Sequence, residues 1–296
     1  MNLRQAFFVI LLASAIVGGT VYFARRVFAP PARPNVPWVA YVDPSVKKLK
    51  EAQELNDHGK LSEARDILVD TLVTAPGAPV TRELRDLLGE INTRLFFRQQ
   101  TSLRKTEYTV VRGDALSSIA RKLKSSADAI IKVNGLESTV IRPGEKLLVP
   151  KLDFTISIDL PRQRVVVHDS HGFFTQYPIA AVDLPKTKSV KVETTVTAKS
   201  FWDGGEPVGG KSKNDSEERT PLIALGRRGY VLYGIAENSE ESESEIEVDG
   251  EDKPSSEVAP DPNYPPQGIA MLKDDIAELK FLIHRGTPVT IILDRK

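Results

Sequence analysis

The stretch from residue 108 to residue 150 restricts the fold of this chain more than any other, because turn formers and apolar residues recur in it at helix and strand spacings. An alternating, β-branched run at 108–112 predicts a strand. Gly113 and Asp114 predict a turn, in which Asp114 caps a helix that starts near Ala115.

Two short helices and a second strand are expected to follow this turn. Asn134 and Gly135 predict a C-cap for the second helix, and 142–145 predicts a turn into a returning strand at 146–149. The order is therefore strand, helix, helix, strand. The apolar residues expected on the helical faces are Leu116, Ile119, Ala120 and Leu123, then Ala127, Ile130, Ile131 and Val133.

This pattern resembles the LysM module, a family that binds glycans containing N-acetylglucosamine, usually peptidoglycan or chitin. The resemblance implies a shallow groove between loops 113–116 and 134–142. Taken individually, the turn formers in these loops are better explained as shaping the turns, whereas the module as a whole favours glycan binding. The positions that carry the match are Tyr108, Val110, Gly113, Asp114, Leu116, Ile119, Ala120, Asn134, Gly135, Ile141, Pro143, Gly144, Leu147, Val149 and Pro150. The residues it implies for glycan binding are Gly113, Asp114, Ala115, Leu116, Asn134, Gly135, Ile141 and Arg142.

Residues 6–24 form an uncharged run that would span about 28 Å as a helix, close to the thickness of a bilayer core. We therefore expect a membrane anchor at 1–27. The alternative is a signal peptide cleaved near Ala13-Ser14-Ala15. Basic residues at 25–26 favour a cytoplasmic bulk, whereas a glycan-binding module favours the other side. We expect a single-pass protein of the bacterial inner membrane with its bulk in the periplasm.

A proline-rich linker is expected at 28–43, followed by a helical region at 44–104 with helices at 45–58, 61–74 and 80–97. This region resembles one tetratricopeptide repeat with an extra helix, and such a hairpin could bind a protein partner. A helical stalk or oligomerising spacer is the other interpretation, because one repeat cannot build a stacked core. The matching positions are Ala52, Gly59, Ala64, Leu68 and Pro76.

The remainder, 152–296, reads as a mainly β domain. Together with the preceding parts it predicts an α+β multidomain chain, which has an N-terminal transmembrane helix, a helical hairpin region, a βααβ module and this β domain. The strands expected are 154–160, 164–168, 173–180, 190–199, 229–235 and 289–293, with a helix at 269–281 that places Met271, Ile276 and Leu279 on one face.

The β domain resembles the catalytic domain of L,D-transpeptidases, which cross-link peptidoglycan or attach proteins to it. The matching segments are 156–160, 164–167, 220–222, 268–271, 275–279 and 286–291. That family uses a cysteine nucleophile, a histidine that activates it, and an arginine.

The catalytic residues of that family are missing here. Tyr233 stands where a histidine is expected, Pro266 at the second histidine, Gly268 at the cysteine and Ala270 at the arginine, and the chain has no cysteine at all. We therefore expect a pseudoenzyme that needs no cofactor or metal. A cysteine restored at position 268 is expected to be inert while the chain folds normally. The four histidines, expected at surfaces or turns, are His58, His168, His171 and His284.

Residues 237–252 form an acidic segment within the β domain, part of a loop expected to be disordered over 237–262. Its spacing is not that of an EF-hand, so a solvated loop is favoured over a calcium site.

Lysine plus arginine and aspartate plus glutamate balance at 40 each, and no basic stripe suggests nucleic acid. The predicted function is a membrane-anchored, non-catalytic protein that binds the glycan strands of peptidoglycan in the bacterial envelope. The alternatives are a divergent wall transpeptidase or hydrolase with another nucleophile, and an envelope assembly scaffold.

Overall fold

The computed structural model of the chain describes residues 43–99, 104–185, 187, 189–203, 206–208, 220–236, 265 and 267–294. The predicted anchor, most of the proline-rich linker, the acidic loop and Pro266 lie outside these residues. Within them, no helix has both the length and the apolar character needed to cross a bilayer.

The helical region consists of α2 (Pro44–Asp57), α3 (Leu61–Thr74) and α4 (Thr81–Phe97), close to the predicted bounds. Gly59 ends the first helix with a φ of +71°, a conformation that glycine adopts without steric cost. The three helices share an apolar core, which contains Ala52, Ala64 and Leu68 of the predicted tetratricopeptide-like positions. It includes Leu49, Ala52, Leu61, Ala64, Leu68, Leu84, Leu88 and Ile91.

The βααβ module follows with β1 (Lys105–Thr109), α5 (Leu116–Lys122), α6 (Ala127–Asn134) and β2 (Lys146–Pro150). The strands pair antiparallel, with Tyr108 opposite Leu147. The predicted first strand at 108–112 is therefore wrong by three residues. Beyond β1, Val110 still donates its N–H to Glu145 O and accepts from Gly144 N. The backbone after Val110 then enters the turn. The earlier start follows from the pairing of Lys151 N with Arg104 O.

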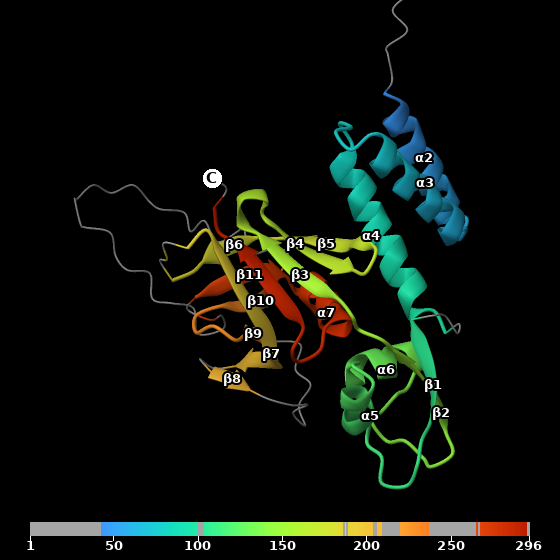
Figure 1. Ribbon diagram of the computed structural model, residues 1–296, viewed down its shortest axis with the longest axis vertical. Coiled ribbons are helices and arrows are strands. Elements are labelled where there is room, and N and C mark those ends of the chain that lie inside the picture. Colours follow the sequence, from blue (N-terminus) through green and yellow to red (C-terminus); the bar gives the residue numbers. More distant parts are fainter. Residues whose placement is uncertain are drawn as a thin grey trace, which may run out of the picture. The chain divides into compact units, whose positions relative to one another are not determined.

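The β domain contains one large sheet, which among the described residues has the order β5-β4-β3-β12-β7-β9-β10-β11-β6, with β8 beside β7. The helix α7 packs on β9, β10 and β11 (Figure 1). The elements are β3 (Thr155–Asp159), η1 (Leu160–Arg162), β4 (Arg164–Asp169), β5 (Gly172–Pro178), β6 (Ala181–Asp183), β7 (Lys191–Asp203), β8 (Glu206–Val208), β9 (Thr220–Leu225), β10 (Val231–Ile235), β11 (Gly268–Leu272), α7 (Lys273–Leu282) and β12 (Pro288–Ile292).

The predicted helix at 269–281 is wrong over its first residues, because Ile269, Ala270 and Met271 lie in β11, parallel to β10. All three are buried. A short apolar run that is buried on both faces has the same composition in a strand as in a core helix, so periodicity cannot separate the two. Met271 therefore does not share a helical face with Ile276 and Leu279, although all three belong to the same core.

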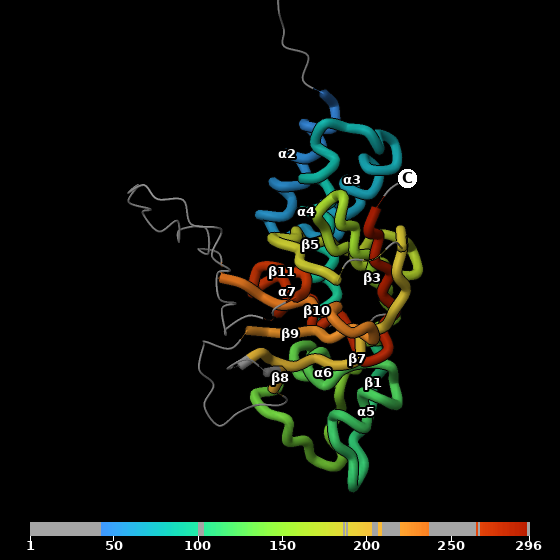
Figure 2. Tube along the Cα trace, turned by 90° about the vertical axis from the view of Figure 1, so that its left-hand side faces the viewer, coloured from blue at the N-terminus to red at the C-terminus, as the bar shows by residue number. Residues whose placement is uncertain are grey.

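The helical region packs directly on the β domain, where α4 contacts β5 (Figures 1 and 2). Asn92 donates from Nδ2 to the carbonyl of Phe174 at 2.8 Å and accepts from Arg65 Nε at 2.9 Å. Gly89 faces Thr175 so closely that a Cβ on it would lie 2.5 Å from Thr175 Oγ1. This contact requires glycine.

The βααβ module also packs on the rest of the chain, and residues 44–296 form one unit by their contacts. Ala129 of α6 is fully buried in the β-domain core. Lys132, on the same helix, holds its Nζ 4.4 Å from the ring of Phe97 and 4.2 Å from that of Phe281. Cation–π contacts of this kind tie α6 to both α4 and α7.

Candidate functional site

The first loop of the βααβ module is shaped by Asp114, but not in the predicted way. Its carboxylate accepts from the backbone N–H of Val111 and from the hydroxyl of Tyr108, both at 2.9 Å. These two bonds, the first above all, hold the pKa of Asp114 below its usual value. The prediction that Asp114 caps α5 is wrong, because the carboxylate closes its own turn. The N–H of Ala115 donates to Ser118 Oγ instead.

The second loop begins at Asn134, whose side-chain amide is fully occupied by the backbone. Its Nδ2 donates to the carbonyls of Ile130 and Leu148, and its Oδ1 accepts from Leu148 N, each at 2.8 Å. Asn134 therefore holds α6 against β2 and sets where the loop leaves the helix. Gly135 follows with a φ of +62°, which confirms the predicted C-cap.

The two loops are joined at their flanks, because Val110, just before the first loop, bonds to Gly144 and Glu145, just after the second, at 2.8 Å. Among the predicted glycan-binding residues, Leu116 is a core residue at 3% exposure, and Asp114, Asn134 and Ile141 are partly exposed. The exposed members are Gly113, Ala115, Gly135 and Arg142.

Two apolar residues in this region were missed by sequence reasoning. Val111 is 56% exposed and Val140 is 76% exposed, and each lies in one of the segments that flank the predicted groove. The signal that could have found them is a β-branched residue inside a run of turn formers, where no strand partner exists to bury it. Gly113 lies beside them with a φ of +96° and open space around the position of a Cβ, so its backbone can be approached closely.

The positions that resemble a transpeptidase centre lie on β10 and β11. Tyr233 is paired in register with Ala270. Gly268 starts β11 with a φ of +155°, and a Cβ on it would lie 2.7 Å from Val231 Cγ2, 2.9 Å from Val231 O and 3.1 Å from Tyr233 Cδ1. Three of the four positions named from the sequence are thus brought together by the parallel pair.

This crowding corrects one expectation. A cysteine at position 268 was expected to leave folding unaffected, but a side chain there must displace the backbone of Val231. The geometry therefore leaves no space for a thiol at this point of the sheet. None of the four histidines lies on β10 or β11.

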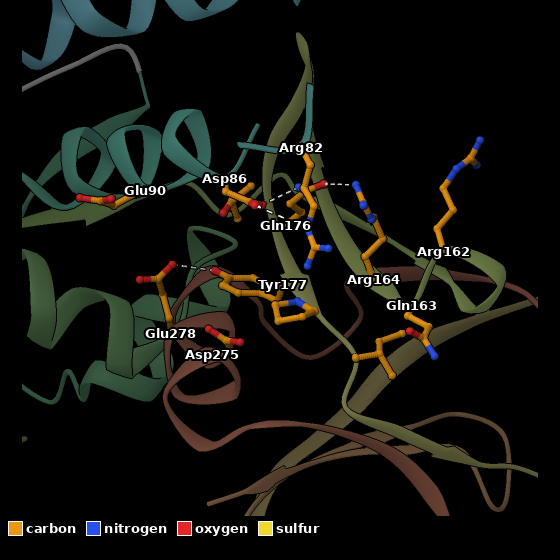
Figure 3. A pocket seen from close by; sticks show the side chains of 13 residues that line it. Arg82, Asp86, Glu90, Arg162, Gln163, Arg164, Gln176, Tyr177, Asp275 and Glu278 are labelled. Atoms are coloured by element: carbon orange, nitrogen blue, oxygen red, sulfur yellow. Dashed lines mark hydrogen bonds and ion pairs between the residues drawn. The ribbon is translucent and has the colours of Figure 1, made fainter. Parts of the chain in front are cut away.

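A cavity of about 410 Å³ lies between α4, the β4–β5 hairpin and α7 (Figure 3). Figure 3 shows its arginines on one side and Asp275 and Glu278 on the other. Burial, with Glu278, Asp274 and Asp86 adding to it, raises the pKa of Asp275 to about 6. Its Oδ2 is buried without a hydrogen-bond partner among the described residues. Tyr177 donates to Glu278 Oε1 at 2.8 Å beside it.

The chain was compared with known proteins and solved structures. No curated protein matches the chain. The structure titled Ldtfm–avibactam carbamoyl enzyme is 14% identical, covers 71% of this chain and 83% of its own, and superposes with a TM-score of 0.27. A Cys-to-Ser mutant of the Enterococcus faecium L,D-transpeptidase is 13% identical, covers 72% of this chain and 90% of its own, with a TM-score of 0.26. Superpositions this weak do not establish a shared fold.

The βααβ module is different, because the family model described as LysM domain matches residues 108–150. These are the residues whose paired strands, two helices and joined loops are described above. The chain therefore contains a LysM domain.

Proposed function

We propose that this protein binds the glycan strands of peptidoglycan through its LysM domain. The observation that carries the proposal is the LysM match over 108–150, on a module whose two loops are joined and expose Val111 and Val140. Sugar rings present C–H faces that pack on such apolar side chains, while the open backbone at Gly113 can reach their hydroxyl and acetamido groups.

The predicted glycan-binding residues fall into two groups, those that can contact the ligand and those that hold the loops in place. Gly113, Ala115, Gly135 and Arg142 are exposed and can touch a ligand. Asn134 and Asp114 act as positioning residues, because their side chains are bound to the backbone that shapes the loops. Leu116 supports the groove from below as part of the module core.

The β domain takes no catalytic part in this function. The chain has no cysteine, and a side chain at Gly268 would collide with Val231. We place the protein in the bacterial cell envelope, anchored in the inner membrane by residues 1–27 with the bulk in the periplasm. That placement rests on the uncharged run in the sequence and on the chemistry of the ligand.

The test is a pelleting assay of the full chain with insoluble peptidoglycan, and Val140→Asp as the loop variant. A charge at Val140 should weaken binding by about tenfold, since an apolar contact with the sugar is replaced by a solvated carboxylate. Val73→Asp is the matched control, because Val73 on α3 is 74% exposed and far in sequence from the module. Equal loss in both variants, or no pelleting of the wild type, would count against the proposal.

A further inference from the structure

A second cavity, of about 880 Å³, lies between the LysM domain and the β domain. One wall comes from α5 and the segment that joins it to α6, and the other from residues 152–155, Lys199 and the turn after α7. It is separate from the predicted glycan-binding loops, although Ser117, at one end, directly follows Leu116 of the first loop.

The charge of this cavity is strongly one-sided. Its titratable lining is five basic side chains and one carboxylate, namely Arg121, Lys124, Lys199, His284, Arg285 and Asp153. Lys199 already pairs with Asp128 at 2.7 Å. Asp153 pairs with Arg104 at 3.2 Å and with Lys151 at 3.3 Å.

Three of the remaining basic side chains form no ion pair with any described residue. These are Arg121, Lys124 and Arg285, while His284 points its Nδ1 at the carbonyl of Arg285. Three unpaired cations around a concave surface attract an anion, because the low-dielectric walls concentrate their field.

A buried hydroxyl belongs to the wall of this cavity. Ser125 lines the cavity, is 5% exposed, and its Oγ has no hydrogen-bond partner in the described part of the chain. That oxygen is itself shielded from the cavity, so a bound anion is inferred from the charged side chains.

The backbone at Lys124 is also unusual. Ser125 N bonds to Ala120 O at 2.8 Å in the manner of a Schellman motif, so that Lys124 occupies the position where glycine is favoured. Its φ is +53°. A lysine in this conformation is less favourable than glycine, and it places a cation at the cavity.

We propose that this cavity binds a carboxylate of the peptide stem carried by the glycan strand, an inference that rests on the proposed function. Arg121 and Arg285 hold the carboxylate, and Lys124 adds a third positive charge beside it. A peptide stem is long enough to reach from the first loop to Arg121. The helix α5 rises about 6 Å from Ser117 to Arg121, whereas an extended peptide of four residues spans about 13 Å. A strand lying in the loops can therefore direct its peptide branch along α5.

The test compares three ligands by calorimetry with the full chain: a tetrasaccharide that carries free tetrapeptide stems, the same saccharide with the stems removed, and the same stem-bearing saccharide with its carboxylates amidated. The stem-bearing saccharide should bind about fivefold more tightly than the other two at low salt, which is about 1 kcal/mol. The double variant Arg121→Ser/Arg285→Ser should abolish that advantage. Arg227→Ser/Arg228→Ser removes the same charge from the exposed turn before β10 and should leave it intact.

The outcomes separate the two proposals. Equal affinity of the wild type for all three saccharides would overturn the carboxylate site and leave glycan binding standing. If no saccharide binds, glycan binding fails, and titration with the free tetrapeptide then decides the site. Binding of that peptide that requires Arg121 and Arg285 would support the site, and no binding would overturn it. The amidated ligand keeps the test valid should the double variant fail to fold.

Discussion

Arg104 Nη1 lies 2.9 Å from Asp169 Oδ2 and forms an ion pair that joins the start of the LysM domain to the β4–β5 hairpin. The Arg104 guanidinium also pairs with Asp153 and lies 5.3, 4.8 and 5.6 Å from the ring centroids of Phe96, Phe154 and Phe174. These rings come from α4, from the segment after β2, and from β5. One side chain thus connects the helical region, the LysM domain and the β domain.

Replacing Arg104 should destabilise the whole unit. Arg104→Met leaves Asp169, whose side chain is only 9% exposed, without its partner, and we expect a loss of about 3 kcal/mol in the free energy of unfolding. Arg104→Lys keeps the charge but loses the planar stacking, so it should lose about 1–2 kcal/mol. Urea unfolding measures both. Arg94→Met, at an exposed pair with Glu90, should cost under about 1 kcal/mol. A similar loss of unfolding free energy for Arg94→Met and Arg104→Met would show that Arg104 does not connect the three parts of the chain.

Gly89→Ala should reverse the usual sign of that substitution. In an open helix, alanine is favoured over glycine by about 1 kcal/mol. Here the added Cβ would lie 2.5 Å from Thr175 Oγ1, and we expect a loss of about 2 kcal/mol. The loss should shrink by about 1 kcal/mol in a Thr175→Ala background, measured as a double-mutant cycle. Gly77→Ala, which meets no atom within 4 Å, is the control and should be near neutral. Stabilisation by Gly89→Ala would show that α4 does not pack on β5 in this way.

Gly268→Cys should fail to restore activity because it disturbs the sheet. The Cβ must displace Val231 O, which belongs to the backbone of β10, and we expect both Gly268→Ala and Gly268→Cys to lose about 2–4 kcal/mol. Gly286→Ala separates strain from crowding, because Gly286 has a φ of +94° with open space; it should cost only about 1 kcal/mol. Thermal unfolding ranks the variants, and release of D-alanine from a tetrapeptide donor tests for turnover. A Gly268→Cys variant as stable as the wild type, or one that turns over the donor, would refute this account.

Asp275→Asn should stabilise the protein in a pH-dependent way. Because burial raises the pKa of Asp275 from 3.8 to about 6, the folded state binds the proton more tightly than the unfolded state. The stability that proton binding at Asp275 contributes is complete below about pH 4 and is lost as the pH rises through about 6. The variant should therefore gain about 1 kcal/mol over the wild type at pH 8 relative to pH 4, a value reduced for partial exposure.

Urea unfolding at pH 4 and pH 8 measures this difference. Asp66→Asn, at an exposed carboxylate on α3, serves as the control. It should change the free energy of unfolding by the same small amount at both pH values. If Asp275→Asn also has the same effect at both pH values, the pKa of Asp275 is the same in the folded and unfolded states, and the cavity in Figure 3 does not perturb it.

Local patterns in the sequence predicted the helices now seen at 44–57, 61–74 and 81–97 to within one residue at each end, and also the strand–helix–helix–strand order of the LysM domain. Residues within a turn or two of each other carry these signals, such as the C-cap at Gly135. The same locality explains the errors. The end of the first LysM strand depends on pairing with a strand almost forty residues later, and the apolar run at 269–271 becomes a strand only beside β10.

The sequence alone determined that a LysM domain is present at 108–150, because that module has its own spacing of apolar and turn residues. Only the tertiary structure decided how the parts of the chain contact one another. The ion pair of Arg104 with Asp169, the fit of Gly89 against Thr175 and the closure of Gly268 by Val231 each join residues that are distant along the chain. The basic cavity between the LysM domain and the β domain exists for the same reason. Such contacts depend on how separate elements pack, and no local propensity encodes them.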